Sequence, residues 1–488
     1  MPAEKLLFLT GHLALPRLEK LLGNLGTTAF DWAIHDIGVK VAALMTGEII
    51  LRRLPKPVLA DRVIVPGRCR ADLDALSRHF EVRFERGPDE LVDLPAFLGR
   101  KGAPPDLSRQ DMRIFAEIVD ASALTAGEIA TRALAMQAAG ADVIDLGCLP
   151  DTPFPHLEET IAELKRQGLK VSVDSASRDE LSRATRAGAD YLLSLNEETL
   201  DIAALGDTVP ILVPAVPHDM ASLDRAIDKA RAMGIAFIAD PILDPIHYGF
   251  SASLVRYHQL RERHPEIEIL MGTGNLTELT DADTSGITAM LLGICSELFI
   301  RSLLVVHVSP HTRRTIEEHD AARRMMFAAR ADSALPRGYS SALLQVHDTK
   351  PFASTPEELF AQGAEVRDRN FRIETAVDGI HVYNRDVHHI ETDAFEFYPK
   401  LGVEDDAAHA FYLGSELQKA EIAWRIGKRY AQDAALDFGV AAPRPDGDRT
   451  KLEAAGHTLK PKTGPEAGHP VASAPATGGL STDAADAD

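Results

Sequence analysis

The sequence predicts an α/β protein built around a (β/α)8 barrel, and three observations support this. Between residues 113 and 328, eight short apolar runs alternate strictly with helix-like stretches. The runs are almost continuously apolar, as expected for parallel strands that are buried on both faces. Eight strand–helix repeats in a stretch of this size match a closed barrel. An open doubly wound sheet is the alternative, but such sheets usually have about five or six strands.

The whole chain is too long for one compact core. Its 488 residues correspond to about three domains at roughly 150 residues each. Apolar residues make up 45% and charged residues 26%, which excludes collagen-like, coiled-coil and wholly disordered chains. The net charge of −21 argues against a nucleic-acid or anionic-membrane partner. We therefore expect an N-terminal α/β domain (1–105), the barrel (106–331), an α+β module (332–440) and a disordered tail (441–488).

Cysteine usage and hydropathy predict the cellular compartment. Cys69, Cys148 and Cys295 are far apart and form no CxxC motif, so a disulfide framework and a structural zinc site are not expected. The first residues lack the features of a signal peptide, and no run of about 18 apolar residues occurs. We expect a cytoplasmic protein without a membrane span.

In the N-terminal domain, short strands alternate with helices, as in an open, flavodoxin-like α/β sheet. We expect strands at 6–11, 41–47 and 62–67, each of which ends in glycine. Helices are expected at 15–25 and 70–80. The turn at Thr10–His12 is a weak signal, typical of any βα connection.

In the central region, a helix-like stretch follows each of eight candidate strands. The clearest of these helices are 126–140, 178–188 and 223–234. The candidate strands are 113–121, 141–147, 170–175, 190–195, 210–216, 236–241, 268–274 and 302–308.

The last hundred ordered residues predict a different, α+β module. Segments 371–377 and 379–386 form a hairpin around Asp378 and Gly379, and we expect its histidines, His381, His388 and His389, to be solvated rather than to bind a metal. A long helix is expected over 414–438, with Gly439 as its terminating glycine. The tail contains no aromatic residue or isoleucine and is expected to be disordered.

Barrel active sites lie at the C-terminal ends of the strands, so polar residues there are the candidate site. Carboxylates and amides suit a ligand with ring N–H and amine donors. Histidine and arginine beside a glycine turn suit a phosphate. The pattern predicts a site for a polar heterocycle that carries a phosphate or diphosphate. The candidates are Glu117, Asp120, Asp145, Asp174, Asn196, Asp240, Asn275, His307, Ser309, His311 and Arg313.

Plainer explanations exist for single candidates. Asp145 and Asp174 could each cap the next helix, although these two and Asp240 together interrupt buried strands in one predicted layer. His307 and His311 have the spacing of a metal-binding pair, but Pro310 between them marks a helix start and argues against it.

Several of these motifs, taken together, resemble a known family. The motifs GADVIDLG (140–147), KVSVDS (170–175), AGADYLLSLN (187–196), IADP (238–241) and VVHV (305–308) follow the order and spacing of dihydropteroate synthases and pterin-binding methyltransferases. The resemblance covers roughly residues 111–330. It implies that Asp174 and Asp240 hold the pterin ring, with Asn196 as the nearest match to a pterin-binding asparagine.

The chain also departs from the folate-pathway pattern in this family. Glu117 and Asp120 stand near the position of the family's strand-1 asparagine. Asn275 and Leu276 occur where the family has a lysine, and Val305 replaces an arginine two residues before His307. The layout, with MGTGN after the seventh strand and YLGSEL in the C-terminal module, resembles dihydropteroate synthase-like proteins of methanopterin users, including methanogens and methylotrophic bacteria.

The resemblance implies a transferase that condenses 6-hydroxymethyl-dihydropterin diphosphate with 4-(β-D-ribofuranosyl)aminobenzene 5′-phosphate. Asp145, Asp174, Asn196 and Asp240 would bind the pterin. His307, Ser309 and Arg313 would take up the charge of the diphosphate, with Mg²⁺ bound through it. Glu117, Asp120 and Asn275 would contact the diphosphate or acceptor, and His307 and Asp174 would be catalytic.

Two other functions stay open, a pterin-dependent methyltransferase and a non-catalytic pterin-binding protein. A corrinoid-binding DxHxxG motif is missing from the N-terminal domain, which counts against the methyltransferase. The nearly all-apolar segment 285–300 predicts a homodimer, and burial under the chain's own C-terminal module is the rival explanation.

Overall fold

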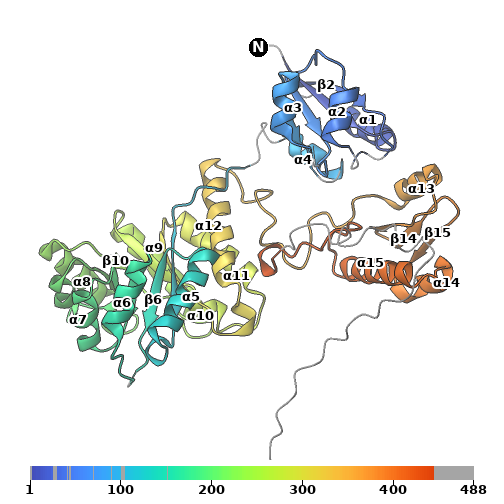
Figure 1. Cartoon of the computed structure of the whole chain (residues 1–488). Helices are drawn as coiled ribbons and strands as arrows, with labels where there is room; N and C mark the ends of the chain where they lie inside the picture. The colour runs from blue at the N-terminus through green and yellow to red at the C-terminus, as the bar shows by residue number, and fades with distance from the viewer. Residues whose placement is uncertain are drawn as a thin grey trace, which may run out of the picture.

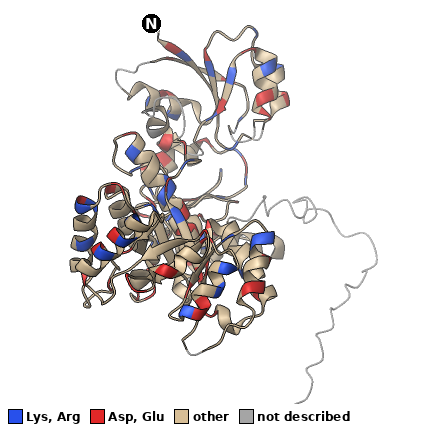
Figure 2. Ribbon diagram, turned by 90° about the vertical axis from the view of Figure 1, so that its left-hand side faces the viewer, with Lys and Arg blue, Asp and Glu red and all other residues tan. Residues whose placement is uncertain are grey.

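The computed structural model describes residues 3–25, 30–40, 42, 45–69, 71–88, 91–99, 105–150 and 152–443. These residues form a four-stranded sheet, a closed barrel and a three-stranded sheet, in that order along the chain (Figure 1). Residues of both charge signs are interspersed on the outer helices of the barrel (Figure 2). The tail predicted to be disordered lies outside the described residues from 444 onward.

The predicted barrel is confirmed, with eight parallel strands closed by pairing of the last with the first. Successive helices cover its outer face: α5 (Ala126–Ala139), α6 (Leu157–Arg166), α7 (Arg178–Arg186), α8 (Met220–Met233), α9 (Phe250–Arg263), α11 (Thr284–Glu297) and α12 (Thr315–Ala331). Only short 3-10 turns, Leu200–Leu205, follow the fourth strand. The strands are β5 (Arg113–Ile118), β6 (Val143–Gly147), β7 (Lys170–Asp174), β8 (Tyr191–Leu195), β9 (Val209–Leu212), β10 (Ile238–Ala239), β11 (Glu268–Gly272) and β12 (Ser302–Val306).

Side chains alternate along each strand between the helices and the barrel interior, and the interior is layered. At the N-terminal end, Arg113 donates to the Tyr191 hydroxyl at 2.8 Å and forms an ion pair with Glu268. An apolar layer follows, which includes Phe115, Val143, Leu193, Ile211, Ile238 and Leu270. The next interior positions toward the C-terminal ends carry acidic residues, so the acidic layer rests on an apolar floor.

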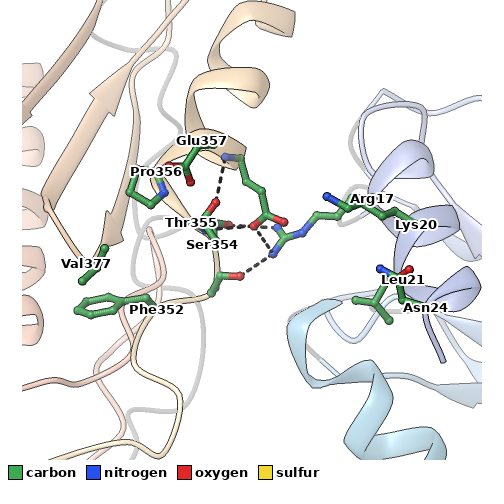
Figure 3. A pocket seen from close by; sticks show the side chains of 12 residues that line it. Arg17, Lys20, Leu21, Asn24, Phe352, Ser354, Thr355, Pro356, Glu357 and Val377 are labelled. Carbon is green, nitrogen blue, oxygen red and sulfur yellow. Dashed lines mark hydrogen bonds and ion pairs between the residues drawn. The ribbon is translucent and has the colours of Figure 1, made fainter. Parts of the chain in front are cut away.

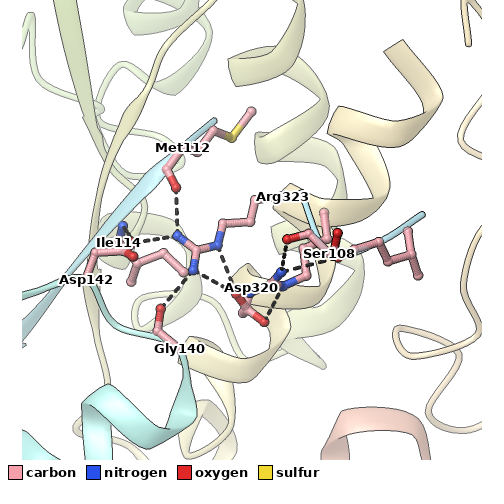
Figure 4. A network of polar contacts seen from close by, with 9 residues as sticks. Ser108, Met112, Ile114, Gly140, Asp142, Asp320 and Arg323 are labelled. Atoms are coloured by element: carbon pink, nitrogen blue, oxygen red, sulfur yellow. Dashed lines mark hydrogen bonds and ion pairs between the residues drawn. The ribbon is translucent and has the colours of Figure 1, made fainter. Parts of the chain in front are cut away.

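A buried arginine ties the last barrel helix to the first two strands (Figure 4). The Arg323 side chain is 3% exposed and donates to the carbonyls of Met112 and Gly140 at 2.7 and 3.0 Å. Arg323 also forms ion pairs with Asp142 and Asp320. The network therefore fixes α12 against the N-terminal ends of β5 and β6.

The N-terminal domain is an open parallel sheet in the order β2-β1-β3-β4. Of the expected strand at 41–47, residues 41, 43 and 44 lie outside the described ranges, and the described residues form no strand, since Gly47 begins a helix. The second strand is Phe30–Asp36, which pairs along the whole of β1. Thr46 instead caps a helix, because its hydroxyl accepts the Ile49 N–H. The strands are β1 (Glu4–Thr10), β2 (Phe30–Asp36), β3 (Arg62–Val65) and β4 (Arg83–Arg86); the helices are α1 (Leu15–Gly23), α2 (Gly47–Arg53), α3 (Leu73–Phe80) and α4 (Leu94–Gly99).

The C-terminal module contains the predicted hairpin, β13 (Arg372–Ala376) and β14 (Gly379–Tyr383), extended by β15 (His388–Glu391). The long helix α15 spans Ala407–Arg425 and not 414–438. It stops early because Gly427 adopts a φ of +62° and the buried Lys428 reaches back to the Leu344 carbonyl at 3.0 Å.

The expectation that the hairpin histidines are solvated is also wrong. His381 is fully buried, and its ring nitrogens contact Asp378 at 2.9 Å and His388 at 3.0 Å. Phe360 of helix α13 (Pro356–Glu365) stacks on His388 with ring centroids 4.4 Å apart. This helix therefore covers the face of the sheet that a lone hairpin would expose.

Candidate functional site

Three carboxyl groups meet at the C-terminal ends of neighbouring strands β5, β6 and β7. The parallel register pairs Glu117 with Asp145, and it pairs Gly147 with Asp174. A Cβ atom on Gly147 would lie 2.7 Å from Glu117 Oε1, so glycine at this position makes room for the Glu117 carboxylate. The barrel thus gathers residues that are far apart in the sequence into one acidic cluster.

Burial makes this cluster hard to ionise. Burial and the neighbouring Asp174 carboxyl raise the pKa of Glu117 to about 7. Burial also raises the pKa of Asp145 well above its usual range, with further contributions from Glu117 and Asp174, and it raises the pKa of Asp174. Neighbouring carboxyl groups over an apolar floor do not all ionise at neutral pH. The cluster therefore offers both hydrogen-bond donors and acceptors.

Asp145 is the residue whose surroundings are least complete. It is fully buried, and neither of its carboxyl oxygens has a hydrogen-bond partner. The Ser172 hydroxyl stands beside it, also without a hydrogen bond of ordinary geometry. Buried polar groups are nearly always paired, so a buried carboxyl group without a hydrogen bond of ordinary geometry is a candidate for a functional role.

Asp174 has a hydrogen-bond partner, Ser194, that was not among the residues singled out from the sequence. The Ser194 hydroxyl donates to Asp174 Oδ1 at 2.9 Å. Ser194 adopts a left-handed φ of +64° at the end of β8, a conformation that residues other than glycine adopt rarely and mostly in constrained places. Asn196 lies two residues later, where its Oδ1 accepts the backbone N–H groups of Glu198 and Thr199. Its side-chain oxygen is thus engaged in the turn.

Asp240 follows β10 and is held through one oxygen. Its Oδ1 accepts the Tyr257 hydroxyl at 2.7 Å and the Ile242 N–H at 2.8 Å. Burial raises the pKa of Asp240 to about 6, against the lowering effect of these two hydrogen bonds. Its second oxygen, Oδ2, takes part in neither hydrogen bond.

The loop after β12 is organised around a carboxylate. Glu278 accepts the N–H groups of Val308 and Ser309 at 2.6 and 3.1 Å and the Thr312 hydroxyl at 2.6 Å. Burial raises the pKa of Glu278, but these hydrogen bonds outweigh it and the net pKa is lowered. The backbone N–H groups of Val308 and Ser309 therefore already bind an anionic group of the protein.

The other candidates occupy different parts of the barrel mouth. Asn275 donates from its amide to the Leu243 carbonyl at 2.6 Å, which joins the loops after β10 and β11. Asp120 Oδ1 accepts a hydrogen bond from Arg132 Nη1 at 2.9 Å. His307 is half-buried directly after β12, and Arg313 is exposed in the loop that follows.

The plainer explanations for the aspartates do not hold. Helix α6 begins after His156, and α7 is capped by Ser177, so neither Asp145 nor Asp174 caps the following helix.

His311, the second histidine of the pair with metal-binding spacing, directs its Nε2 to the Thr277 carbonyl at 3.1 Å. Among the residues described, no group of three or more histidine, cysteine or acidic side chains is arranged to hold a metal ion.

A cavity of about 650 Å³ lies away from the barrel, between α1 and the start of α13 (Figure 3). Arg17 crosses it, donating to the Ala353 carbonyl at 2.5 Å and the Ser354 hydroxyl at 3.1 Å and lying 3.6 Å from Glu358. Because Arg17 is already paired in this way, we interpret the cavity as part of the contact between the outer domains.

Within the described ranges, no helix has the length and apolar character needed to cross a membrane.

The chain is similar to two groups of known sequences and structures, of which the first consists of sequence relatives. A family model described as a family of unknown function (DUF6513) matches residues 4–89. The uncharacterized protein MJ0107 of Methanocaldococcus jannaschii is 26% identical over 524 aligned residues, which cover 88% of this chain and 99% of that protein.

The second group consists of solved structures. A dihydropteroate synthase of Yersinia pestis with a pterine-sulfa conjugate is 19% identical, with a TM-score of 0.36, over 48% of this chain and 97% of that one. The Xanthomonas albilineans dihydropteroate synthase in complex with 7,8-dihydropteroate is 20% identical, with a TM-score of 0.35, over 47% of this chain and 95% of that one.

Proposed function

We propose that this protein is a pterin transferase of the dihydropteroate synthase type, which joins 6-hydroxymethyl-dihydropterin diphosphate to an arylamine. The acceptor we propose is 4-(β-D-ribofuranosyl)aminobenzene 5′-phosphate, which places the reaction in tetrahydromethanopterin biosynthesis. The observation that carries the proposal is Asp145, a fully buried carboxyl group without a partner beside Asp174. The strand-end motifs that resemble the pterin-binding family support it.

The acidic layer suits the edge of a pterin. The ring presents an amino group and an N–H as donors, and ring nitrogens and a carbonyl as acceptors. Ionised Asp174 and Asp240 would accept from the donors, whereas a protonated Asp145 or Glu117 would donate to the acceptors.

The reaction breaks the bond between the pterin methylene carbon and the diphosphate oxygen. His307 and Arg313 would stabilise the departing charge, which is mainly electrostatic work. Mg²⁺ usually keeps several waters and binds substrate phosphates with few protein ligands. A Mg²⁺ bound through the diphosphate would neutralise charge on the leaving group.

A second candidate function is a pterin-binding protein without transferase activity. The observation that favours it is Glu278, whose carboxylate takes the N–H groups of Val308 and Ser309. A negative charge at this place opposes a diphosphate. The two candidates share the pterin pocket and differ only in whether product forms.

One experiment separates them. Isothermal titration with 6-hydroxymethyl-dihydropterin diphosphate measures binding, and a product assay with each arylamine measures condensation. Binding with product formation is the expected result, with a strong preference for the phosphorylated acceptor over p-aminobenzoate. Binding without product supports the pterin-binding protein without transferase activity. Failure to bind the pterin rejects both candidates.

A further inference from the structure

Four residues other than glycine adopt left-handed backbone conformations at the ends of the neighbouring strands β8, β9 and β10. Their φ angles are +64° at Ser194, +71° at His218, +67° at Ile242 and +70° at His247. Such conformations are unfavourable and cluster where function requires a particular side chain. Ser194 donates to Asp174 of the acidic cluster. The left-handed conformations of the residues after β9 and β10 need another explanation.

His218 occupies a turn position that normally calls for glycine. The Asp219 N–H donates to the Val216 carbonyl at 3.0 Å, with Pro217 and His218 between them. Proline at the second position and a positive φ at the third match a type II turn, in which glycine is the usual third residue. A histidine at such a position is uncommon, which directs attention to what its imidazole contacts.

A buried carboxylate fixes the imidazole. His218 Nε2 lies 3.3 Å from Asp244 Oδ1 and 3.2 Å from Oδ2. Asp244 is 8% exposed and also accepts from Arg256 Nη2 at 2.7 Å. A Cβ on Gly249 would lie 2.7 Å from Asp244 Oδ2, so the chain keeps glycine where Asp244 needs the space.

The same helix fixes the predicted pterin-binding carboxylate. Arg256 holds Asp244, and the next residue, Tyr257, donates to Asp240. Arg256 also donates to the carbonyls of Pro241 and Ile242 at 3.2 and 2.8 Å. One turn of α9 therefore positions the pterin carboxylate and the histidine–aspartate pair relative to each other.

The free edge of the imidazole is accessible. The His218 side chain is 56% exposed, on a loop at the C-terminal end of β9, where barrel active sites lie. With Nε2–H donated to Asp244, the neutral ring carries its lone pair on Nδ1. No hydrogen bond joins Nδ1 to any residue in the described ranges.

We propose that His218, oriented by Asp244, is the base that removes the proton from the arylamine nitrogen; this inference rests on the proposed function. The amine lone pair forms the N–C bond to the pterin methylene carbon while the C–O bond to the diphosphate breaks. The new secondary ammonium passes one proton to His218 Nδ1, and the imidazolium, stabilised by Asp244, later releases it to water.

Attack itself needs no base, because an arylamine is neutral at pH 7. The ammonium that it forms can revert while the diphosphate is still nearby, so removal of the proton makes the bond permanent. An aspartate-oriented histidine is well suited to this step.

The test is the variant His218→Gly in the full-length protein. Glycine tolerates the left-handed φ, so the variant should fold at least as well as the wild type. We expect unchanged binding of 6-hydroxymethyl-dihydropterin diphosphate and a kcat/KM for the arylamine lower by about 100-fold or more. Added imidazole should restore the rate. His247→Gly, with the same φ in the next loop, is the matched control and should be as active as the wild type.

The outcomes separate this role from the proposed function. If the wild type binds pterin and forms product but His218→Gly is equally active, or is inactive without rescue by imidazole, the role of His218 is wrong and the function stands. A loss seen only with the phosphorylated acceptor, and not with p-aminobenzoate, would make His218 a phosphate contact and also contradict the role. A wild type that binds no pterin overturns the function together with this role.

Discussion

The substitution Asp240→Asn separates the function of this residue from its effect on folding. Both hydrogen bonds that hold Asp240 go to Oδ1, from the Tyr257 hydroxyl and the Ile242 N–H. An asparagine keeps this oxygen as an acceptor and places its NH2 group at Oδ2. The local fold should persist, but the new NH2 group cannot accept from a pterin N–H. We expect pterin affinity to fall by about 1.5–3 kcal/mol, roughly 10- to 150-fold.

The same change should stabilise the ligand-free protein above pH 6. Burial raises the pKa of Asp240 from 3.8 to about 6. A carboxyl group with a raised folded-state pKa favours folding when it is neutral, and this contribution is lost as pH rises from the unfolded value to the folded one. At 1.36 kcal/mol per tenfold change in acidity, the loss amounts to about 3 kcal/mol. An amide does not ionise and has no such loss, so the variant should gain about 3 kcal/mol at about pH 8.

The assay is urea unfolding of both proteins at several pH values, followed by far-ultraviolet circular dichroism. Tryptophan fluorescence does not report on the barrel, because Trp32 and Trp424 lie in the outer domains. The stability difference between variant and wild type should shrink toward zero as the pH falls from about 6 to about 4.

Two results would refute this reasoning. A variant that is less stable than the wild type at all pH values would mean that the Asp240 charge is compensated within the barrel. A variant with wild-type pterin affinity would remove Asp240 from the site.

Three further predictions concern the barrel. Arg323→Met should destabilise the barrel by about 3–5 kcal/mol, because Asp320 and Asp142 lose their buried partner. Thermal melting followed by circular dichroism measures this loss, and pterin titration is the control. Ser194→Ala should weaken pterin binding more than Asn196→Ala, since Ser194 contacts Asp174 whereas the Asn196 oxygen serves its own turn; titration calorimetry compares them, and the reverse order would contradict the site. Met290, 72% exposed on α11, should lie in a homodimer interface, so Met290→Glu should yield a monomer by light scattering; a wild type that is already monomeric would count against the dimer.

The sequence alone determined more of the barrel than of the domains around it. The eight strands were predictable because apolar runs buried on both faces leave a pattern that needs no tertiary information. Asp145, Asp174 and Asp240 stood out as candidate site residues for the same reason, since each interrupts such a run. The strand at 30–36 was missed because an edge strand such as FDWAIHD mixes apolar and charged residues.

Only the tertiary structure decided which polar groups meet and which are already occupied. The parallel register of β5 and β6 places Glu117 beside Asp145, although the two residues are 28 positions apart in the sequence. The Glu278 carboxylate takes the amide groups of the loop after β12, and Asn196 takes those of its own turn. Helix α15 ends at Arg425 because a buried lysine turns the chain back. Periodicity records which side of an element is buried, but hydrogen bonds and charge pairs depend on groups brought close by folding, and no local pattern encodes them.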